Sequence, residues 1–227
     1  MPALNEQKYL GDWLKWEPDN HYSRDIVTAL AGTGADRVLT TGMVLGRITK
    51  GAATGAAVAG NTGNGTITAA PTVGAAAKPG VYRLVCIEPG TDAGKFTVED
   101  PDGILIGVAT VGVQFATHLT FTIADGSTDF VSGDAFTITV AAGSGKVKQI
   151  DFAATDGSDA AFGLLLLDTT APDGSDKSAV AIVRSAIVSD NGIAWPAGAT
   201  TNQKTTATAQ LNALGILVRE GALTPCQ

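Results

Sequence analysis

The stretch VKQIDFAATDGSDAAFGLLLLDTTAP, residues 147–172, decides the fold of this chain. Its first residues have strand character, and DGSD at 156–159 offers a turn in which glycine supplies positive φ. The apolar run at 160–167 is typical of a buried strand, and the apolar stretch at 177–188 predicts a further strand pair. These residues predict a compact core built from short strands.

The segments on either side continue this pattern and add one helix. Residues 25–49 hold short apolar groups separated by glycines, which is typical of short strands and tight turns. Residues 200–214 have a different period: Thr201 or Asn202 can cap a helix there, and Gly215 stands where a helix commonly ends. The three apolar residues after this glycine predict a final short strand.

The composition changes between residues 50 and 146, where Gly, Ala, Thr and Val dominate. Residues 52–77 contain little that can pack, which predicts a mobile connector or loosely held strands. Beyond them, short strands alternate with turns, as expected of a small β-sandwich or partial barrel. These expected strands lie at 81–87, 95–99, 104–108, 119–124 and 136–140.

Composition and charge exclude several classes of function. A chain of 227 residues with 44% hydrophobic content has room for one large domain or two small ones, and the change of composition favours two. The net charge of −7 argues against binding to nucleic acid, which requires clustered Lys and Arg. The run at 162–167 is too short to cross a membrane, and the N-terminus lacks a secretory signal, so synthesis in the cytoplasm is expected.

The residues that carry most enzyme chemistry are scarce. His21 and His118 are the two histidines, and no nucleophile-elbow motif accompanies them. His118 is expected on the outer face of a strand, within FATHLTFTI. The sequence therefore predicts a protein that is not an enzyme and has no cofactor.

Acidic residues offer the other candidate chemistry. Five aspartates in the middle of the chain have oxygen atoms that could bind calcium, but they stand at expected turns, where Asp is preferred for backbone reasons. These aspartates are Asp100, Asp102, Asp125, Asp129 and Asp134. Their spacing does not complete an EF-hand loop, and the two cysteines are too few for a zinc cluster. No metal site is predicted.

The N-terminal segment is rich in aromatic residues. Tyr9, Trp13 and Trp16, together with Leu10 and Leu14, have spacings compatible with one face of a short helix. Two interpretations stay open: the segment docks onto the protein's own core, or it is an arm that becomes ordered against a partner. Large aromatic side chains serve as anchors in protein interfaces, which gives the second interpretation its physical basis.

Joined across the glycine-rich region, residues 23–49 and 147–218 resemble the head decoration proteins of tailed bacteriophages, the lambda D type. The run DGSDAAFGLL at 156–165 followed by AWP at 194–196 is similar to the family's pattern "DGT-D-GAA-GIL … LWP". The resemblance implies a mainly β fold: a compact β-rich core with one late helix, interrupted by a small β-sandwich-like insert.

The same resemblance implies three parts. Residues 1–22 would form a capsid-binding arm, residues 23–50 and 146–227 a discontinuous decoration-protein core, and residues 51–145 an inserted β domain with a flexible Gly/Ala-rich connector. Tyr9, Trp13 and Trp16 are then the candidate capsid contacts.

The function that the resemblance implies is structural. Such a protein would bind the outside of the expanded phage head as trimers at threefold sites, contact the major capsid protein, and stabilise the shell against packaged DNA. Direct contact with nucleic acid or with a membrane is not expected. The alternative is an adhesin or carbohydrate-binding module that recognises host-surface glycans through the inserted domain, where many displayed copies would raise avidity.

Overall fold

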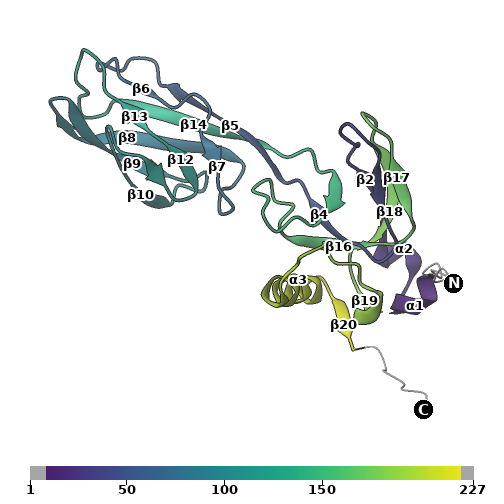
Figure 1. The fold of residues 1–227 in the computed structure, drawn as a ribbon. Helices are drawn as coiled ribbons and strands as arrows, with labels where there is room; N and C mark the ends of the chain where they lie inside the picture. The colour runs from purple at the N-terminus through teal and green to yellow at the C-terminus, as the bar shows by residue number, and fades with distance from the viewer. Residues whose placement is uncertain (1–8, 221–227) are drawn as a thin grey trace. The chain divides into compact units, whose positions relative to one another are not determined.

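The computed structural model describes residues 9–220 (Figure 1). The chain divides into two compact units, which are considered separately below. Unit 1 combines Met1–Ile48 with Gly145–Gln227, and unit 2 is Thr49–Ser144. The mainly β fold with one late helix, expected from the sequence, is confirmed.

A closed five-stranded barrel forms the centre of unit 1. Its strand order is β15 (Val147–Gln149), β2 (Arg24–Ala29), β18 (Lys177–Ile182), β16 (Ala161–Leu165) and β4 (Val44–Arg47). Neighbouring strands are antiparallel except for β15 and β2, which run parallel and meet at Val147 and Ala29. The short strands expected on both sides of the glycine-rich region therefore pair with one another across about a hundred residues of intervening chain.

A three-stranded sheet and a pair of antiparallel strands complete unit 1. The sheet has the order β1 (Leu14–Trp16), β19 (Ala186–Ser189) and β20 (Ile216–Arg219), and the pair consists of β3 (Arg37–Leu39) and β17 (Thr169–Ala171). A single 3-10 turn, η1 (Asp190–Gly192), follows β19. Side chains of β16, β19, β20 and the late helix share one apolar cluster, so the sheet packs on the barrel wall.

The predicted late helix is α3 (Thr201–Ala213). Its N-cap is Thr200, one residue before the expected cap, because Thr200 and Gln203 bond to each other's backbone N–H in a capping box. Gly215 follows the helix with φ of 78°, as expected for a residue that ends a helix in the left-handed region. No helix among residues 9–220 is long and apolar enough to cross a membrane.

Unit 2 is built on a five-stranded antiparallel sheet. Its order is β10 (Leu105–Thr110), β9 (Ala93–Glu99), β8 (Gly80–Gly90), β14 (Ala135–Ala142) and β5 (Lys50–Ala57). Shorter strands lie against the inner face of this sheet: β11 (Phe115–Ala116), β12 (Leu119–Phe121) and β7 (Thr72–Val73) form one group, and β13 (Ile123–Ala124) pairs with β6 (Thr66–Ile67). The expected strands of the insert are thus present in a sandwich-like arrangement.

Residues 52–77, for which a mobile connector and loosely held strands were both open, contribute to β5, β6 and β7, and β5 pairs with β14 from Lys50 to Ala57. One local expectation for this unit is corrected. His118 lies in the turn between β11 and β12 and not on a strand face. The low hydrophobicity of 52–77 conceals these strands, although Ala53, Ile67 and Val73 pack in the apolar core of the unit.

Aromatic packing explains why part of this segment is glycine-rich. Phe130 packs edge-on against Phe96 with ring centroids 5.1 Å apart, and its ring lies close to the backbone of Gly63 and Gly65. A Cβ on Gly65 would lie 2.2 Å from Cζ of Phe130, which is impossible without displacement of the ring. Glycine at this position lets the chain pass directly over the core.

Candidate functional site

The N-terminal aromatic segment is divided between the core and the surface. It forms α1 (Leu10–Trp13), then β1, then α2 (Asn20–Ser23), which leads directly into β2. The spacing predicts one short helical face, but the helix ends at Trp13 because Leu14 begins a strand and pairs with Val188. The aromatic residues on either side of this boundary therefore point in different directions.

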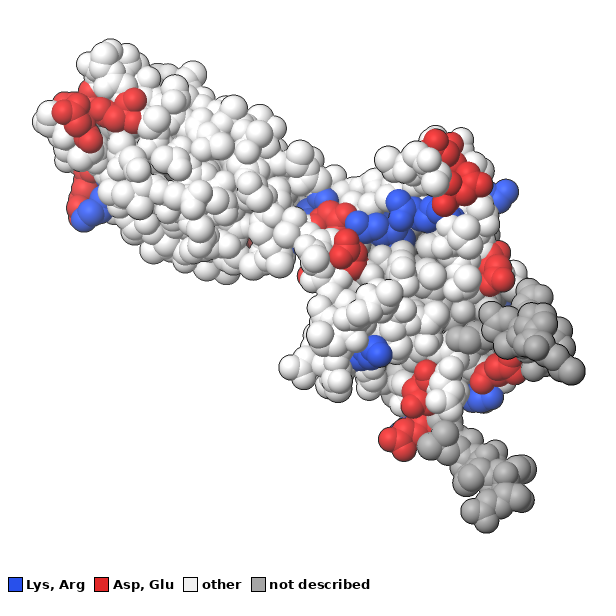
Figure 2. Space-filling model, viewed as in Figure 1, with Lys and Arg blue, Asp and Glu red and all other residues white. Residues whose placement is uncertain are grey.

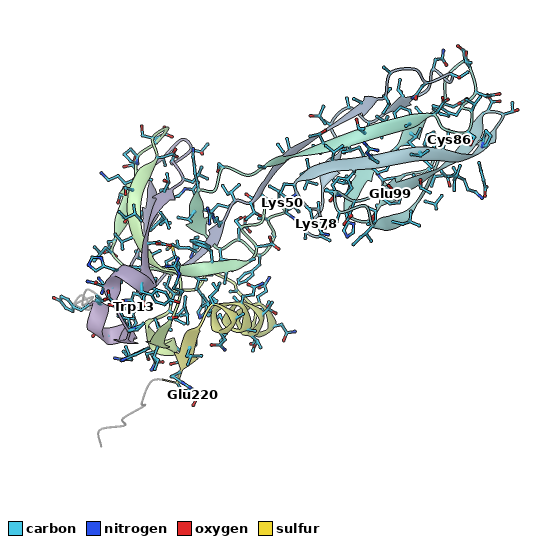
Figure 3. All side chains as sticks on the ribbon, turned by 180° about the vertical axis from the view of Figure 1, so that it is seen from behind. Trp13, Lys50, Lys78, Cys86, Glu99 and Glu220 are labelled. Atoms are coloured by element: carbon cyan, nitrogen blue, oxygen red, sulfur yellow. The ribbon has the colours of Figure 1, made fainter. Side chains whose placement is uncertain are left out.

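Trp13 is a core residue (Figure 3). Its side chain is completely buried, and the indole Nε1 donates a hydrogen bond of 3.0 Å to Oγ1 of Thr41. Gly192 lies so close that a Cβ there would be 1.9 Å from Cβ of Trp13. For Trp13, the interpretation in which the segment docks onto the protein's own core describes the structure, and the side chain is not accessible to a partner.

Tyr9 and Trp16, in contrast, are exposed. Their accessible fractions are 64% and 54%. Tyr9 precedes α1, where its backbone N–H donates to the Asp12 carboxylate, and Trp16 lies at the end of β1 opposite Ile187. These two of the three expected contact residues remain available to a partner.

Tyr22 and Ile26 extend the exposed apolar surface and were not singled out from the sequence. Tyr22 is 56% exposed and Ile26 is 81% exposed. Arg24 lines a shallow recess with Trp16 and a second one with Ile26. We call the four exposed residues Tyr9, Trp16, Tyr22 and Ile26 the N-terminal surface. The alternation of a strand places Ile26 equally well inside or outside, so its exposure was not predictable.

Ion pairs hold the N-terminal surface in place. The guanidinium of Arg24 pairs with the Glu17 carboxylate through two hydrogen bonds. Arg184 bonds to Asp25 at 2.6 Å, donates to the backbone oxygen of Tyr22, and lies 5.7 Å from the centroid of the Tyr22 ring. Paired guanidinium groups of this kind restrict neighbouring side chains, which lowers the entropy lost when a partner binds.

The two histidines do not assemble a catalytic group. His21 lies in α2 of unit 1, and its backbone N–H donates to the carboxylate of the N-cap Asp19. His118 belongs to unit 2, where its Nδ1 is buried without a hydrogen-bond partner. Among residues 9–220, no hydrogen bond or ion pair joins either imidazole ring to a carboxylate or a nucleophile.

Three of the five candidate aspartates form contacts within unit 2. Asp100 accepts a 2.9 Å hydrogen bond from Nζ of Lys78, and this contact, helped by the backbone N–H of Ile104, lowers the pKa of its carboxyl group. Burial alone would raise the pKa of Asp134, but three backbone N–H donors, of Thr62, Gly63 and Val131, outweigh it and lower the pKa. Both carboxylates organise loops of unit 2, and Asp102 forms an exposed ion pair with Lys78 at 2.5 Å.

The other two aspartates, Asp125 and Asp129, meet Asp92, which the sequence analysis did not include. Oxygen atoms of the three carboxylates lie within 4.8 Å of one another. Figure 2 shows acidic side chains gathered at one end of this unit. Oδ1 of Asp125 is buried and has no hydrogen-bond partner in the described part of the chain. Exposed acidic groups often gather without a cation, so these residues are not assigned as a metal site.

Comparison with known proteins identifies one family. A family model described as "Bacteriophage lambda head decoration protein D" matches residues 3–216. No curated protein matches the chain. Two crystal structures of Xanthomonas campestris FlgL, in space groups H3 and C2, are each 21% identical with a TM-score of 0.31. Each match covers 48% of this chain and 34% or 33% of the FlgL chain, so about a third of the FlgL length is matched. A structural likeness this weak carries no argument.

Proposed function

The chain belongs to the family of bacteriophage lambda head decoration protein D, and we propose that it is a cement protein of the expanded phage head. Family membership supports a structural, capsid-decorating role in the virion. The finer proposal is that trimers bind the outer surface at threefold sites, contact the major capsid protein, and stabilise the shell against packaged DNA. The observation that carries it is the match over residues 3–216, which includes both chain segments of unit 1.

The proposed capsid contacts are Tyr9 and Trp16 of the N-terminal surface. Their exposure supports this role, because large aromatic side chains left in solvent are typical anchors of an interface. Trp13 contributes indirectly: its burial fixes the position of α1, which Tyr9 precedes, and of β1, which ends at Trp16. A ring of three copies also requires two different patches on each copy, and the N-terminal surface supplies one candidate.

The inserted domain is proposed as a separate module displayed by the decorating core. Under the three-part division, residues 51–145 add a β-sandwich to a capsid-binding core, and all five strands of the barrel belong to unit 1. The alternative function, glycan recognition by an adhesin or carbohydrate-binding module, is not favoured by its side chains. All six aromatic rings of unit 2 are buried, so they offer no stacking platform for a sugar ring: Tyr82, Phe96, Phe115, Phe121, Phe130 and Phe136.

Shell stability tests the cement role. Expanded capsids of the parent phage, lacking decoration protein, are heated with and without saturating amounts of the chain, and shell disruption is followed by light scattering and electron microscopy. The proposal predicts disruption at a higher temperature when the protein is present, since a ligand that binds only the intact shell stabilises it by mass action. An unchanged disruption temperature at saturating protein would reject the role.

A further inference from the structure

Strand β8 of the five-stranded sheet in unit 2 carries three aliphatic side chains on its outer face. In β8, Tyr82 and Leu84 point into the core, while Val81, Val85 and Ile87 alternate with them on the other face. Val81 and Ile87 are each 46% exposed. A sheet with one solvated face normally carries polar residues there, so this strand departs from the ordinary pattern.

The apolar area continues across neighbouring strands. Val85 stands opposite Thr97 of β9, and Thr97 stands opposite Val108 of β10, which is 45% exposed. Leu105, at the start of β10, is 57% exposed. We call this area the outer-face patch; its members are Val81, Val85, Ile87, Leu105 and Val108. Exposed aliphatic side chains grouped on one face, here with Thr97 between Val85 and Val108, are a candidate interaction site.

Two opposite charges stand beside each other at the patch. Arg83 of β8 and Glu99 of β9 are register partners on the same outer face (Glu99 is labelled in Figure 3). Neither forms an ion pair with any described residue, whereas the nearby Lys95 is already paired with Glu88 at 2.6 Å. A face with one unpaired cation next to one unpaired anion is complementary to a copy of itself turned by 180°.

We propose that the outer-face patch binds the same patch of a second copy of this chain. Around a twofold axis, Arg83 of each copy faces Glu99 of the other, and the aliphatic side chains of the two sheets pack between them at the usual spacing of about 10 Å. The apolar area supplies the attraction, and the two reciprocal charge pairs select the orientation.

The size of the face sets the expected strength. The three strands that carry the patch, β8, β9 and β10, lie about 4.8 Å apart and extend about 20 Å, which gives a plane of roughly 300 Å². This is smaller than the roughly 800 Å² per partner of a standard interface. The association is therefore weak and depends on concentration. On a shell that holds many copies, which rests on the proposed function, the raised effective concentration would link neighbouring copies through their inserts.

Charge-swap variants of the full chain test this contact. Sedimentation velocity at increasing protein concentration is compared for the wild type, Arg83→Glu, Glu99→Arg, the double variant, and an equimolar mixture of the two single variants. Each single variant places like charges opposite each other and should weaken association at least tenfold. The double variant and the mixture restore opposite charges at both contacts and should associate as the wild type does.

Lys177→Glu and Glu220→Arg are matched controls, because each makes the same change of charge at an exposed position of unit 1. They should associate as the wild type does. The proposal would be overturned if the wild type did not associate at any accessible concentration. It would also be overturned if both single variants associated as the wild type does, and self-association would then be assigned to another surface. Neither result depends on capsid binding, so failure here is distinguishable from failure of the cement role.

Discussion

Trp13 and Thr41, 28 positions apart in sequence, are joined by a buried hydrogen bond of 3.0 Å from the indole Nε1 to the threonine Oγ1. The same hydroxyl donates to the backbone oxygen of Leu166 at 2.8 Å. The N-terminal segment is thus fastened to the barrel by a side chain that is both a large apolar group and a hydrogen-bond donor. Substitution of Trp13 should therefore lower the stability of unit 1, whereas substitution of the exposed Tyr9 or Trp16 should affect it much less.

Trp13→Ala should destabilise unit 1 by about 3–5 kcal/mol, because it removes a fully buried large side chain and leaves a cavity. This change should therefore disturb the core and not only a contact with a partner. Urea unfolding measured by circular dichroism gives the free energy. Trp16→Ala is the matched control and should cost less than about 1 kcal/mol; equal losses for the two variants would contradict the assignment.

Trp13→Phe separates packing from hydrogen bonding. Phenylalanine keeps an aromatic ring in the site but cannot donate to Thr41, so the loss of stability should be smaller than for alanine. Trp13→Phe should cost less in a Thr41→Val background than in the wild type, because the hydrogen bond is already lost there and only the packing cost remains. Strict additivity in this double-mutant cycle would mean that the hydrogen bond between Trp13 and Thr41 contributes nothing to the stability of unit 1.

Gly65→Ala should destabilise unit 2, because the new methyl group would meet the Phe130 ring. Overpacking of this kind costs about 1–3 kcal/mol. Differential scanning calorimetry of the full chain should show a lower transition for unit 2 and an unchanged transition for unit 1. Phe130→Leu should relieve part of the added cost of Gly65→Ala, and identical costs in both backgrounds would show that the ring is not the obstacle.

Unit 2 should lose stability in acid, because protonation removes the stabilising contribution of the Asp134 carboxylate. Its pKa is lower in the folded protein than in the unfolded chain, so its contribution is present above the unfolded pKa of about 4 and is lost as the pH falls through the folded value. Asp134→Ala leaves three backbone N–H groups without their acceptor and should cost about 1–3 kcal/mol at pH 7.

The measurement for Asp134 is the difference in unfolding temperature between wild type and Asp134→Ala from pH 7 to pH 3. The difference should narrow below pH 4, because protonation weakens the wild-type contacts that the variant already lacks. A difference that stays constant over this range would mean that the carboxylate's charge is not what stabilises the loops.

Much of the fold was predictable from local signals. Thr200 to Gly215 carries both ends of helix α3, and the alternation in β8, β9 and β14 is plain in the sequence. The direction of Trp13 was not predictable, because helical spacing does not tell where a helix ends and a strand begins. β5 was hidden by its Gly and Ala content, and Asp92 joins Asp125 and Asp129 only through folding of distant loops.

The N-terminal surface was likewise only half predictable. Composition pointed to Tyr9 and Trp16, but the exposure of Ile26 depends on which side of the barrel wall β2 presents outward. Long-range pairing decides that orientation, and a shift of one residue would reverse it.

The central claim is that the chain decorates the capsid through its N-terminal surface, and co-sedimentation with expanded, undecorated capsids of the parent phage tests it most directly. Removal of residues 1–22 is unsuitable, because it would also remove Trp13 and β1 from the core.

The comparison uses wild type, Tyr9→Ala, Trp16→Ala and the exposed control Lys177→Ala. The account predicts saturable binding by wild type and control, approaching one copy per capsid subunit, and at least tenfold weaker binding by Trp16→Ala with unchanged stability. Absence of wild-type binding would contradict the decoration role, and equal binding by all four proteins would contradict the N-terminal surface as the contact.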